Sequence, residues 1–131
     1  MKNLVNFREP DLSAHAADWL GYLDGIVQTD KYVDSLWNFI QNHEHYKDQT
    51  TLIVTNDHGR HSQGINGGFN GHGDNCDGCR NISLLALGPD IKKGIVLESE
   101  YDQRDVNATL GYLMRTPQRY SEGRVIYELF K

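Results

Sequence analysis

Apolar residues follow a helical rhythm through one long stretch near the start of the chain. Between about residues 16 and 42 most of them stand three or four positions apart, which places them on one face of a helix. Gly21 and Gly25 lie inside this stretch and weaken the helical pattern, which allows a break near them. The pattern therefore predicts one long helix over about residues 16–42.

Other segments have the patterns of strands and of a second helix. Residues 50–55 and 82–87 are short apolar runs, typical of buried strands, and residues 4–8 alternate as a short strand would. Asp105 is a suitable N-cap, and apolar positions at helical spacing follow it up to Met114. The sequence thus predicts three strands and two helices.

The order of these elements favours a particular fold class. Strand, helix, strand, loop, strand and helix in succession predict a single α/β domain over residues 1–131, a layered sandwich with a largely parallel sheet. In such sheets, ligands bind beyond the carboxyl ends of the strands. Asp11 and the pair Asp57 and His58 each follow a predicted strand, so they are expected at one rim of the sheet.

Composition narrows the function classes. Hydrophobic residues make up 38% and charged residues 24%, which is typical of a soluble globular protein. The formal net charge is −5 and no run of Lys or Arg occurs, so nucleic-acid binding is not expected. No apolar stretch approaches the roughly 20 residues that a membrane-spanning helix needs.

Five residues form a candidate metal-binding set. Asp11 and His15 are four apart, so on a helical turn both side chains point the same way. Asp57 and His58 end a predicted strand, and His72 lies in a loop rich in glycine. Each short motif alone is more often a turn or a surface pair, but their combination favours a metal site. Carboxylate and imidazole donors suit Zn²⁺, and Mn²⁺ less well.

The loop over residues 60–80 has its own motif. Cys76 and Cys79 form a C-x-x-C, but no second pair of ligands with matching spacing follows, so a local disulfide or two loop thiols are favoured. His61 is interpreted as a loop histidine. Loops of this length in compact domains are usually functional or disordered.

Several motifs, taken in order, resemble those of the alkaline phosphatase superfamily. They are D-L-S-A-H, then T-N-D-H-G after an apolar strand, then a His in a glycine-rich loop, then an apolar strand ending in G-P-D, and finally D-V-N-A-T-L and G-R-V. That superfamily includes phosphodiesterases, phosphomutases and sulfatases. The resemblance covers nearly the whole chain, but only the C-terminal, metal-binding part of such an enzyme.

The resemblance implies a hydrolase with two metal ions. Asp11, His15 and His72 would hold one ion, and Asp57 and His58 would hold the other. The two ions would assist in-line displacement on a small anionic ester. Three histidines favour zinc, with Mn²⁺ or Ca²⁺ as alternatives, and phosphate-type esters over the sulfate esters of the Ca²⁺-dependent sulfatase branch.

The resemblance also indicates what this chain lacks. The nucleophile and a further metal-binding Asp would come from an N-terminal half, and no Ser or Thr here stands at the nucleophile's place, so no catalytic residue is assigned and the chain alone is expected to be inactive. A periplasmic or secreted location follows from the same resemblance. Removing half of a sheet would expose a strand edge, which predicts self-association.

Two rival hypotheses stand beside the hydrolase. One is a non-catalytic module that keeps the fold and binds a partner. The other is a structural zinc protein that uses Cys76, Cys79 and nearby histidines. Replacing Cys76 would release the metal from the structural zinc protein, whereas replacing His15 would release it from the hydrolase site.

Overall fold

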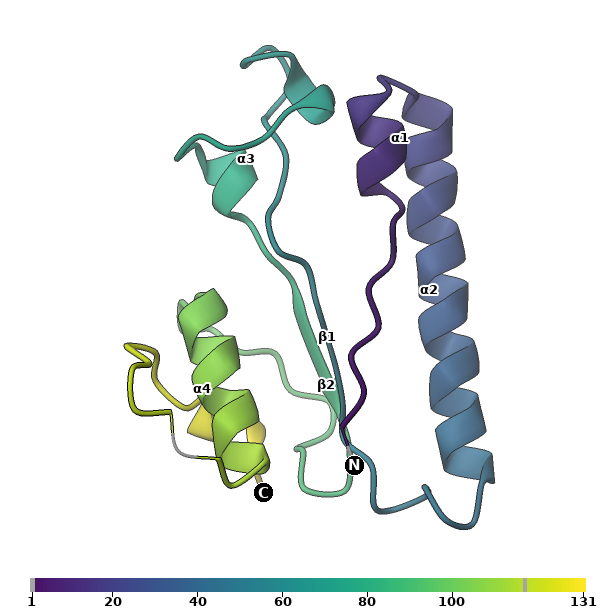
Figure 1. Ribbon diagram of the computed structural model, residues 1–131, viewed down its shortest axis with the longest axis vertical. Coiled ribbons are helices and arrows are strands. Elements are labelled where there is room, and N and C mark those ends of the chain that lie inside the picture. The colour runs from purple at the N-terminus through teal and green to yellow at the C-terminus, as the bar shows by residue number, and fades with distance from the viewer. Residues whose placement is uncertain (1, 117) are drawn as a thin grey trace. The chain divides into compact units, whose positions relative to one another are not determined.

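A computed structural model describes residues 2–116 and 118–131 (Figure 1). The chain divides into two compact units. Unit 1 comprises the N-terminal residues to Lys47 together with His58–Asn81, and unit 2 comprises Asp48–Asp57 together with Ile82–Lys131. The single domain predicted over residues 1–131 stays a prediction. No helix in the described ranges is both long enough and apolar enough to span a membrane.

Unit 1 contains the predicted long helix, divided differently from the prediction. Helix α1 (Asp11–His15) and helix α2 (Trp19–Asn42) are separated by a short turn in which Ala17 has a φ of 57°. The side chain of Asp18 then caps α2 by accepting a hydrogen bond from the Gly21 amide at 2.9 Å. Helix α2 continues through Gly21 and Gly25, and the turn and the cap set its start.

The N-terminal segment packs against α2 instead of forming a strand. Residues 2–8 have no regular secondary structure, so the strand predicted over residues 4–8 is wrong. The Phe7 ring stacks on Tyr32 of α2, with 5.9 Å between the ring centroids. Gly25 of α2 lets this segment approach closely, since a Cβ there would lie 3.1 Å from the Pro10 Cα. Contacts with a helix replace the neighbouring strand that an isolated alternating segment requires.

Unit 2 contains the two other predicted strands, but they run in opposite directions. Strand β1 (Leu52–Thr55) pairs antiparallel with β2 (Leu84–Leu87), with Leu52 opposite Leu87 (Figure 1). The layered sandwich with a largely parallel sheet is therefore wrong. The described residues form a mostly helical and coil architecture with one two-stranded antiparallel sheet.

The chain between β1 and β2 explains why these strands are antiparallel and not parallel. A parallel pair needs a crossover of about a dozen or more residues, usually a helix that packs on the sheet. Between β1 and β2 the chain forms only the short helix α3 (Asp77–Arg80) and the 3₁₀ helix η1 (Gly68–Asn70). The intervening loop thus returns the chain to pair with β1 from the opposite direction.

The second predicted helix is confirmed with an earlier start. Helix α4 (Gln103–Leu113) begins after Asp102, whose side chain accepts a hydrogen bond from the Arg104 amide at 2.8 Å. Asp105, the predicted N-cap, is the third helical residue, and its carboxylate accepts a hydrogen bond from the Asp102 amide at 3.0 Å. The two aspartates form a reciprocal capping box.

A small apolar core lies in unit 2. Ile91, Ile126 and Leu129 are buried together, and Leu129 belongs to the 3₁₀ helix η2 (Tyr127–Leu129). Ile91 also forms an isolated antiparallel bridge with Phe130, which joins the C-terminus to the segment after β2. Apolar burial of this kind provides the general stabilisation of unit 2.

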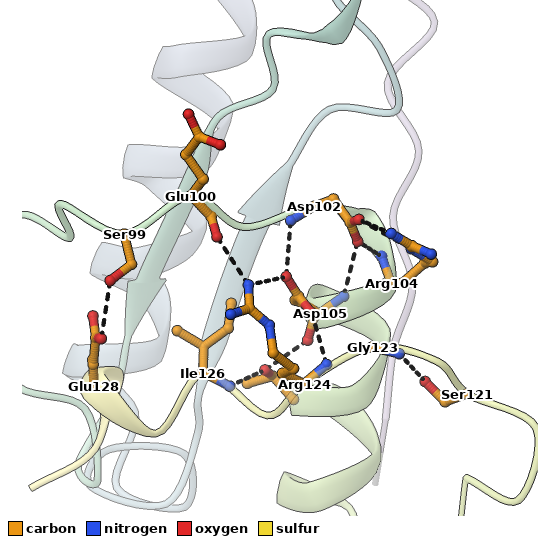
Figure 2. A network of polar contacts seen from close by, with 11 residues as sticks. Ser99, Glu100, Asp102, Arg104, Asp105, Ser121, Gly123, Arg124, Ile126 and Glu128 are labelled. Carbon is orange, nitrogen blue, oxygen red and sulfur yellow. Dashed lines mark hydrogen bonds and ion pairs between the residues drawn. The ribbon is translucent and has the colours of Figure 1, made fainter.

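A buried carboxylate joins α4 to the C-terminal segment. Figure 2 shows the Asp105 carboxylate between the Asp102 amide and Arg124, whose amide donates to it at 2.7 Å and whose guanidinium donates at 3.4 Å. Burial alone would raise the pKa of Asp105. The hydrogen bonds from these two amides and the Arg124 charge outweigh it, so the pKa lies below its usual value.

Candidate metal centres

Unit 1 brings one carboxylate and three imidazoles together. One ligand atom each from Asp11, His58 and His72 lies within 4.8 Å of the others. The Nε2 atom of His15 is 3.1 Å from Nε2 of His72 and 3.5 Å from a carboxylate oxygen of Asp11. We name these four residues the histidine cluster.

Three separate segments supply the histidine cluster. One turn of α1 carries Asp11 and His15, four residues apart, as the sequence predicts. The rings of His58 and His72 stack with their centroids 3.7 Å apart and a 14° angle between their planes. Nδ1 of His58 lies 2.9 Å from the Gly59 carbonyl oxygen and donates to it as an N–H, which orients the ring.

Burial and the nearby positive groups favour the neutral ring of His72. Partial burial is the largest effect that lowers its pKa, followed by the nearby His58, Arg60 and His15, whereas Asp11 acts in the opposite direction. The pKa of His72 consequently lies below its ordinary value. A neutral imidazole is the form that binds metals, so the cluster keeps His72 ready to act as a ligand.

Arg60 adds a cation beside the cluster. Its guanidinium donates to the Asp11 carboxylate and, at 3.3 Å, to the Asp11 carbonyl oxygen. The Arg60 side chain is 11% exposed, and within the described ranges its Nη1 is buried without a hydrogen-bond partner. The guanidinium thus places a positive charge beside the cluster, which is suited to attract an anionic group.

Asp57 is not part of the histidine cluster. It belongs to unit 2, its side chain is exposed, and its carbonyl oxygen accepts a hydrogen bond from the Gln103 side chain. His58, the next residue, belongs to unit 1. The structure therefore brings together four of the five predicted ligands and leaves the fifth in the other unit.

A second group of metal-ligand side chains lies in the glycine-rich loop of unit 1. Nδ1 of His61 is 3.2 Å from the Cys79 sulfur, 3.5 Å from the Cys76 sulfur and 3.4 Å from a carboxylate oxygen of Asp74. All four ligand atoms lie within 4.8 Å of one another. We name these four residues the thiol cluster, and they form a set that can hold a metal ion with donors of the kind zinc prefers.

Local backbone structure builds the thiol cluster. Cys76 caps α3, and its sulfur accepts a hydrogen bond from the Cys79 amide at 3.4 Å. The Asp74 carboxylate accepts hydrogen bonds from the Cys76 amide at 2.9 Å and from the Asn66 side chain at 2.8 Å. The two cysteines are free thiols, so the local disulfide left open by the sequence is not formed.

The thiols and the carboxylate affect one another's protonation. The hydrogen bond with the Cys76 side chain is the main reason why the pKa of Asp74 lies well below its usual range. The same contact raises the pKa of the Cys76 thiol. The Cys76 thiol thus donates to the Asp74 carboxylate, and two sulfurs and a carboxylate lie together at one place in the loop.

The sequence allowed nearby histidines as partners of the cysteines but did not single out His61, and it did not indicate Asp74. Sequence reasoning sought a second pair of ligands at the spacing of a zinc knuckle, whereas the partners are one residue 15 positions before Cys76 and another two positions before it. The available signal was the presence of a His, an Asp and two Cys within one glycine-rich loop. His61 is buried, unlike a typical loop histidine.

Comparison with known proteins adds no relative. No protein-family model, no curated protein and no solved structure matches the chain. What this chain does must consequently be inferred from its own residues, and above all from the two clusters of unit 1.

Proposed function

We propose that this chain is the metal-binding part of a hydrolase that acts on phosphate-type esters, with the histidine cluster as its metal site. The observation that carries the proposal is the convergence of Asp11, His15, His58 and His72 from three segments of unit 1. The resemblance of their motifs to the alkaline phosphatase superfamily gives the reaction class. The proposal depends on these ligands and not on the sheet, whose predicted parallel arrangement is wrong.

The donor set fits a zinc ion. Zinc binds His nitrogen and carboxylate oxygen at about 2.0–2.2 Å in a tetrahedron, so two such donors on one ion stand roughly 3.3 Å apart. The distances of 3.1 Å from His15 to His72 and 3.5 Å from His15 to Asp11 are close to this value. Mn²⁺ also accepts these donors, whereas Ca²⁺ prefers oxygen ligands throughout.

The residues of the site have distinct roles in this proposal. A bound zinc ion would polarise an ester oxygen and stabilise negative charge on it. Asp11 would provide negative charge that holds the cation, and the three histidines would bind it through imidazole nitrogens. The Arg60 guanidinium beside the cluster would attract the anionic group.

Chemical turnover requires a residue outside this set. The chain has no Ser or Thr at the position that the resemblance gives to the nucleophile, and we assign no catalytic residue. We therefore expect the chain by itself to bind a divalent ion and an anion without measurable turnover. The identity of the ester, and the choice between phosphate and sulfate, also depend on residues outside this set.

A Mn²⁺ titration followed by electron paramagnetic resonance tests the proposal. Mn²⁺ disfavours thiolates, so it reports on the histidine cluster rather than on the cysteines. We expect about one Mn²⁺ per chain, at least 10-fold weaker binding in His15→Ala and His72→Ala, and unchanged binding in His45→Ala, which replaces an exposed histidine outside the cluster. Equal binding in all four proteins would refute the site.

A second titration tests the substrate class. Inorganic phosphate should bind the Mn²⁺-loaded chain in calorimetry, and Arg60→Gln should weaken that binding by about 10-fold, since one charge-assisted hydrogen bond contributes roughly 1.5 kcal/mol. Sulfate is the competitor that separates the two branches of the superfamily. If the loaded chain binds neither anion, the metal site is not a hydrolase site and the partner-binding module becomes the better interpretation.

A further inference from the structure

We infer that the thiol cluster is a second metal site, a structural zinc site that fastens the glycine-rich loop and thereby positions His58, Arg60 and His72. The zinc site itself is independent of the proposed hydrolase function. Only its effect on the histidine cluster rests on that proposed function. The two parts are tested by separate measurements.

The spacing of the ligand atoms matches a tetrahedral zinc ion. With Zn–S bonds of about 2.3 Å and Zn–N and Zn–O bonds of about 2.0–2.2 Å, a sulfur and a nitrogen stand roughly 3.5 Å apart, and a nitrogen and an oxygen roughly 3.3 Å. The distances from His61 Nδ1 are 3.2 Å and 3.5 Å to the sulfurs of Cys79 and Cys76, and 3.4 Å to Asp74. One ion can therefore contact all four residues.

Ligand atoms crowd around one buried nitrogen. The sulfurs of Cys76 and Cys79 and a carboxylate oxygen of Asp74 all lie within 3.5 Å of Nδ1 of His61. The His61 side chain is only 6% exposed and Cys79 is buried, whereas the Asp74 side chain is 38% exposed. A zinc ion satisfies all four donors at once, and its binding releases the two thiol protons to solvent.

The surroundings are those of a closed, structural site. Four protein ligands complete the tetrahedron and leave no position for a substrate. Asn66 orients the Asp74 carboxylate, and the Cys79 amide donates to the Cys76 sulfur, as outer contacts of metal ligands commonly do. This distinguishes the thiol cluster from the histidine cluster, whose Asp11 and His15 side chains are about half exposed.

Backbone hydrogen bonds connect the thiol cluster to the histidine cluster. The Gly59 amide, between His58 and Arg60, donates to the Cys79 carbonyl oxygen at 2.8 Å. The His61 amide donates to the carbonyl oxygen of Gly71, the residue before His72, at 3.1 Å. Zinc at the thiol cluster would therefore hold both loop histidines of the other cluster in place.

The zinc site is tested on the unmodified chain with Co²⁺ as a spectroscopic substitute for zinc. We expect a thiolate-to-cobalt charge-transfer band, and two thiols that a maleimide reagent modifies at least 10-fold more slowly once zinc is bound. The band should be lost in Cys79→Ser and kept in His15→Ala. No charge-transfer band, equal thiol reactivity with and without zinc, or a Cys76–Cys79 disulfide under oxygen in the presence of zinc would each overturn the inference.

The coupling is tested by Mn²⁺ affinity with and without zinc. One equivalent of zinc, which the thiolates of the thiol cluster bind in preference to the histidine cluster, should strengthen Mn²⁺ binding at the histidine cluster by about 10-fold. Cys76→Ser should abolish that gain. Unchanged Mn²⁺ affinity with zinc bound would overturn the coupling and leave the hydrolase proposal intact. Absence of Mn²⁺ binding beside a normal cobalt band would refute the hydrolase proposal and, with it, the coupling, while the zinc site would stand.

Discussion

Each unit has a different kind of internal interaction. Unit 2 buries Ile91, Ile126 and Leu129 in one apolar cluster, and the Asp105 carboxylate joins α4 to the C-terminal segment. In the described part of unit 1, the buried apolar residues are Ala14, Ile40 and Cys79. Unit 1 has instead two clusters of metal-ligand side chains.

The exposed apolar residues of unit 1 reinforce this difference. Helix α2 leaves many large hydrophobic side chains accessible: Trp19, Leu20, Leu23, Ile26, Val27, Tyr32, Leu36 and Phe39. Little apolar surface is thus removed from water to offset the entropy of ordering the glycine-rich loop. We therefore expect the order of this loop to depend on bound metal ions, whereas unit 2 has a core of its own.

Removal of zinc should have the largest effect, and it should be confined to unit 1. Zinc at about 100 times its dissociation constant stabilises a site by roughly 2.7 kcal/mol, which corresponds to about a 100-fold change in the open population. We expect a chelator to accelerate proteolysis between residues 62 and 73 by that factor. Mass spectrometry of the fragments measures it.

Unit 2 provides the internal control for that experiment. Cleavage within α4 should be unaffected by the chelator, and added zinc should restore protection of the loop. Equal acceleration in the loop and in α4 would contradict the comparison, because it would show that both units depend on the metal.

A close backbone contact gives the next largest effect. A Cβ at Gly78 would lie 2.2 Å from the Arg60 carbonyl oxygen, so Gly78→Ala must push α3 away from the segment that carries His58 and Arg60. We expect unit 1 to lose about 2 kcal/mol of stability and both clusters to bind metal more weakly. Fluorescence during urea unfolding measures it, since both tryptophans, Trp19 and Trp37, lie on α2.

The neighbouring exposed residue is the matched control. Asp77→Ala removes a side chain from the same short helix without introducing a clash, and should cost less than about 0.5 kcal/mol. Similar losses in both variants would show that α3 is merely fragile, and that the approach of Gly78 to Arg60 does not connect the two clusters.

The sequence predicted elements better than it predicted their arrangement. Hydrophobic periodicity correctly indicated α2, α4, β1 and β2, because burial of one face is a local property. The same periodicity does not specify which partner a strand has or in which direction it runs, and the antiparallel pairing of β1 with β2 depends on the loop between them. The run at residues 4–8 failed for a related reason, since its contacts are with a helix.

The candidate site was predictable to the extent that its ligands follow a short-range rule. Asp11 and His15 meet because four residues make one helical turn, and that spacing can be read directly. His61 meets Cys79 across 18 positions of irregular loop, a separation that no periodicity governs. Asp57 shows that neighbours in sequence can belong to different units, because it lies in unit 2 although the next residue, His58, lies in unit 1.

Replacing the buried carboxylate of unit 2 should have a smaller effect than either change in unit 1. Asp105→Asn turns an acceptor of two backbone amides into a group that is partly a donor, and should cost about 1.5 kcal/mol at pH 7. Hydrogen exchange of α4 amides measures it. Metal binding in unit 1 should be unchanged, and a lost metal ion would contradict the separation of the two units.

The pH dependence of that loss follows from the lowered pKa of Asp105. A carboxylate whose pKa is lower in the folded state stabilises the protein above its ordinary pKa, near 4, and this contribution is lost as the pH falls through the folded value. The difference between wild type and Asp105→Asn should therefore be full at pH 7 and shrink below about pH 4. A difference that stays constant down to pH 3 would mean that the charge is not the cause.

The smallest expected losses of stability come from two substitutions in unit 2, one in a helix cap and one in a surface ion pair. Asp102 accepts the Arg104 amide as the N-cap of α4, and Asp102→Ala should cost about 1 kcal/mol. The Arg104 guanidinium pairs with the same carboxylate at 2.6 Å, but its side chain is 63% exposed, so Arg104→Ala should cost less than about 0.5 kcal/mol.

The side-chain hydrogen bond from Arg104 is the main reason why the pKa of Asp102 falls to about 2. The stabilisation that depends on the Asp102 charge is therefore fully present above about pH 4 and is lost as the pH falls towards 2. Arg104→Ala should move this loss to higher pH while the cap itself remains. Hydrogen exchange at the first turn of α4 measures both variants. If the arginine variant loses as much as the aspartate variant at pH 7, unit 2 depends on its surface charges as well as on its core, and the contrast with unit 1 narrows to the metal ligands alone.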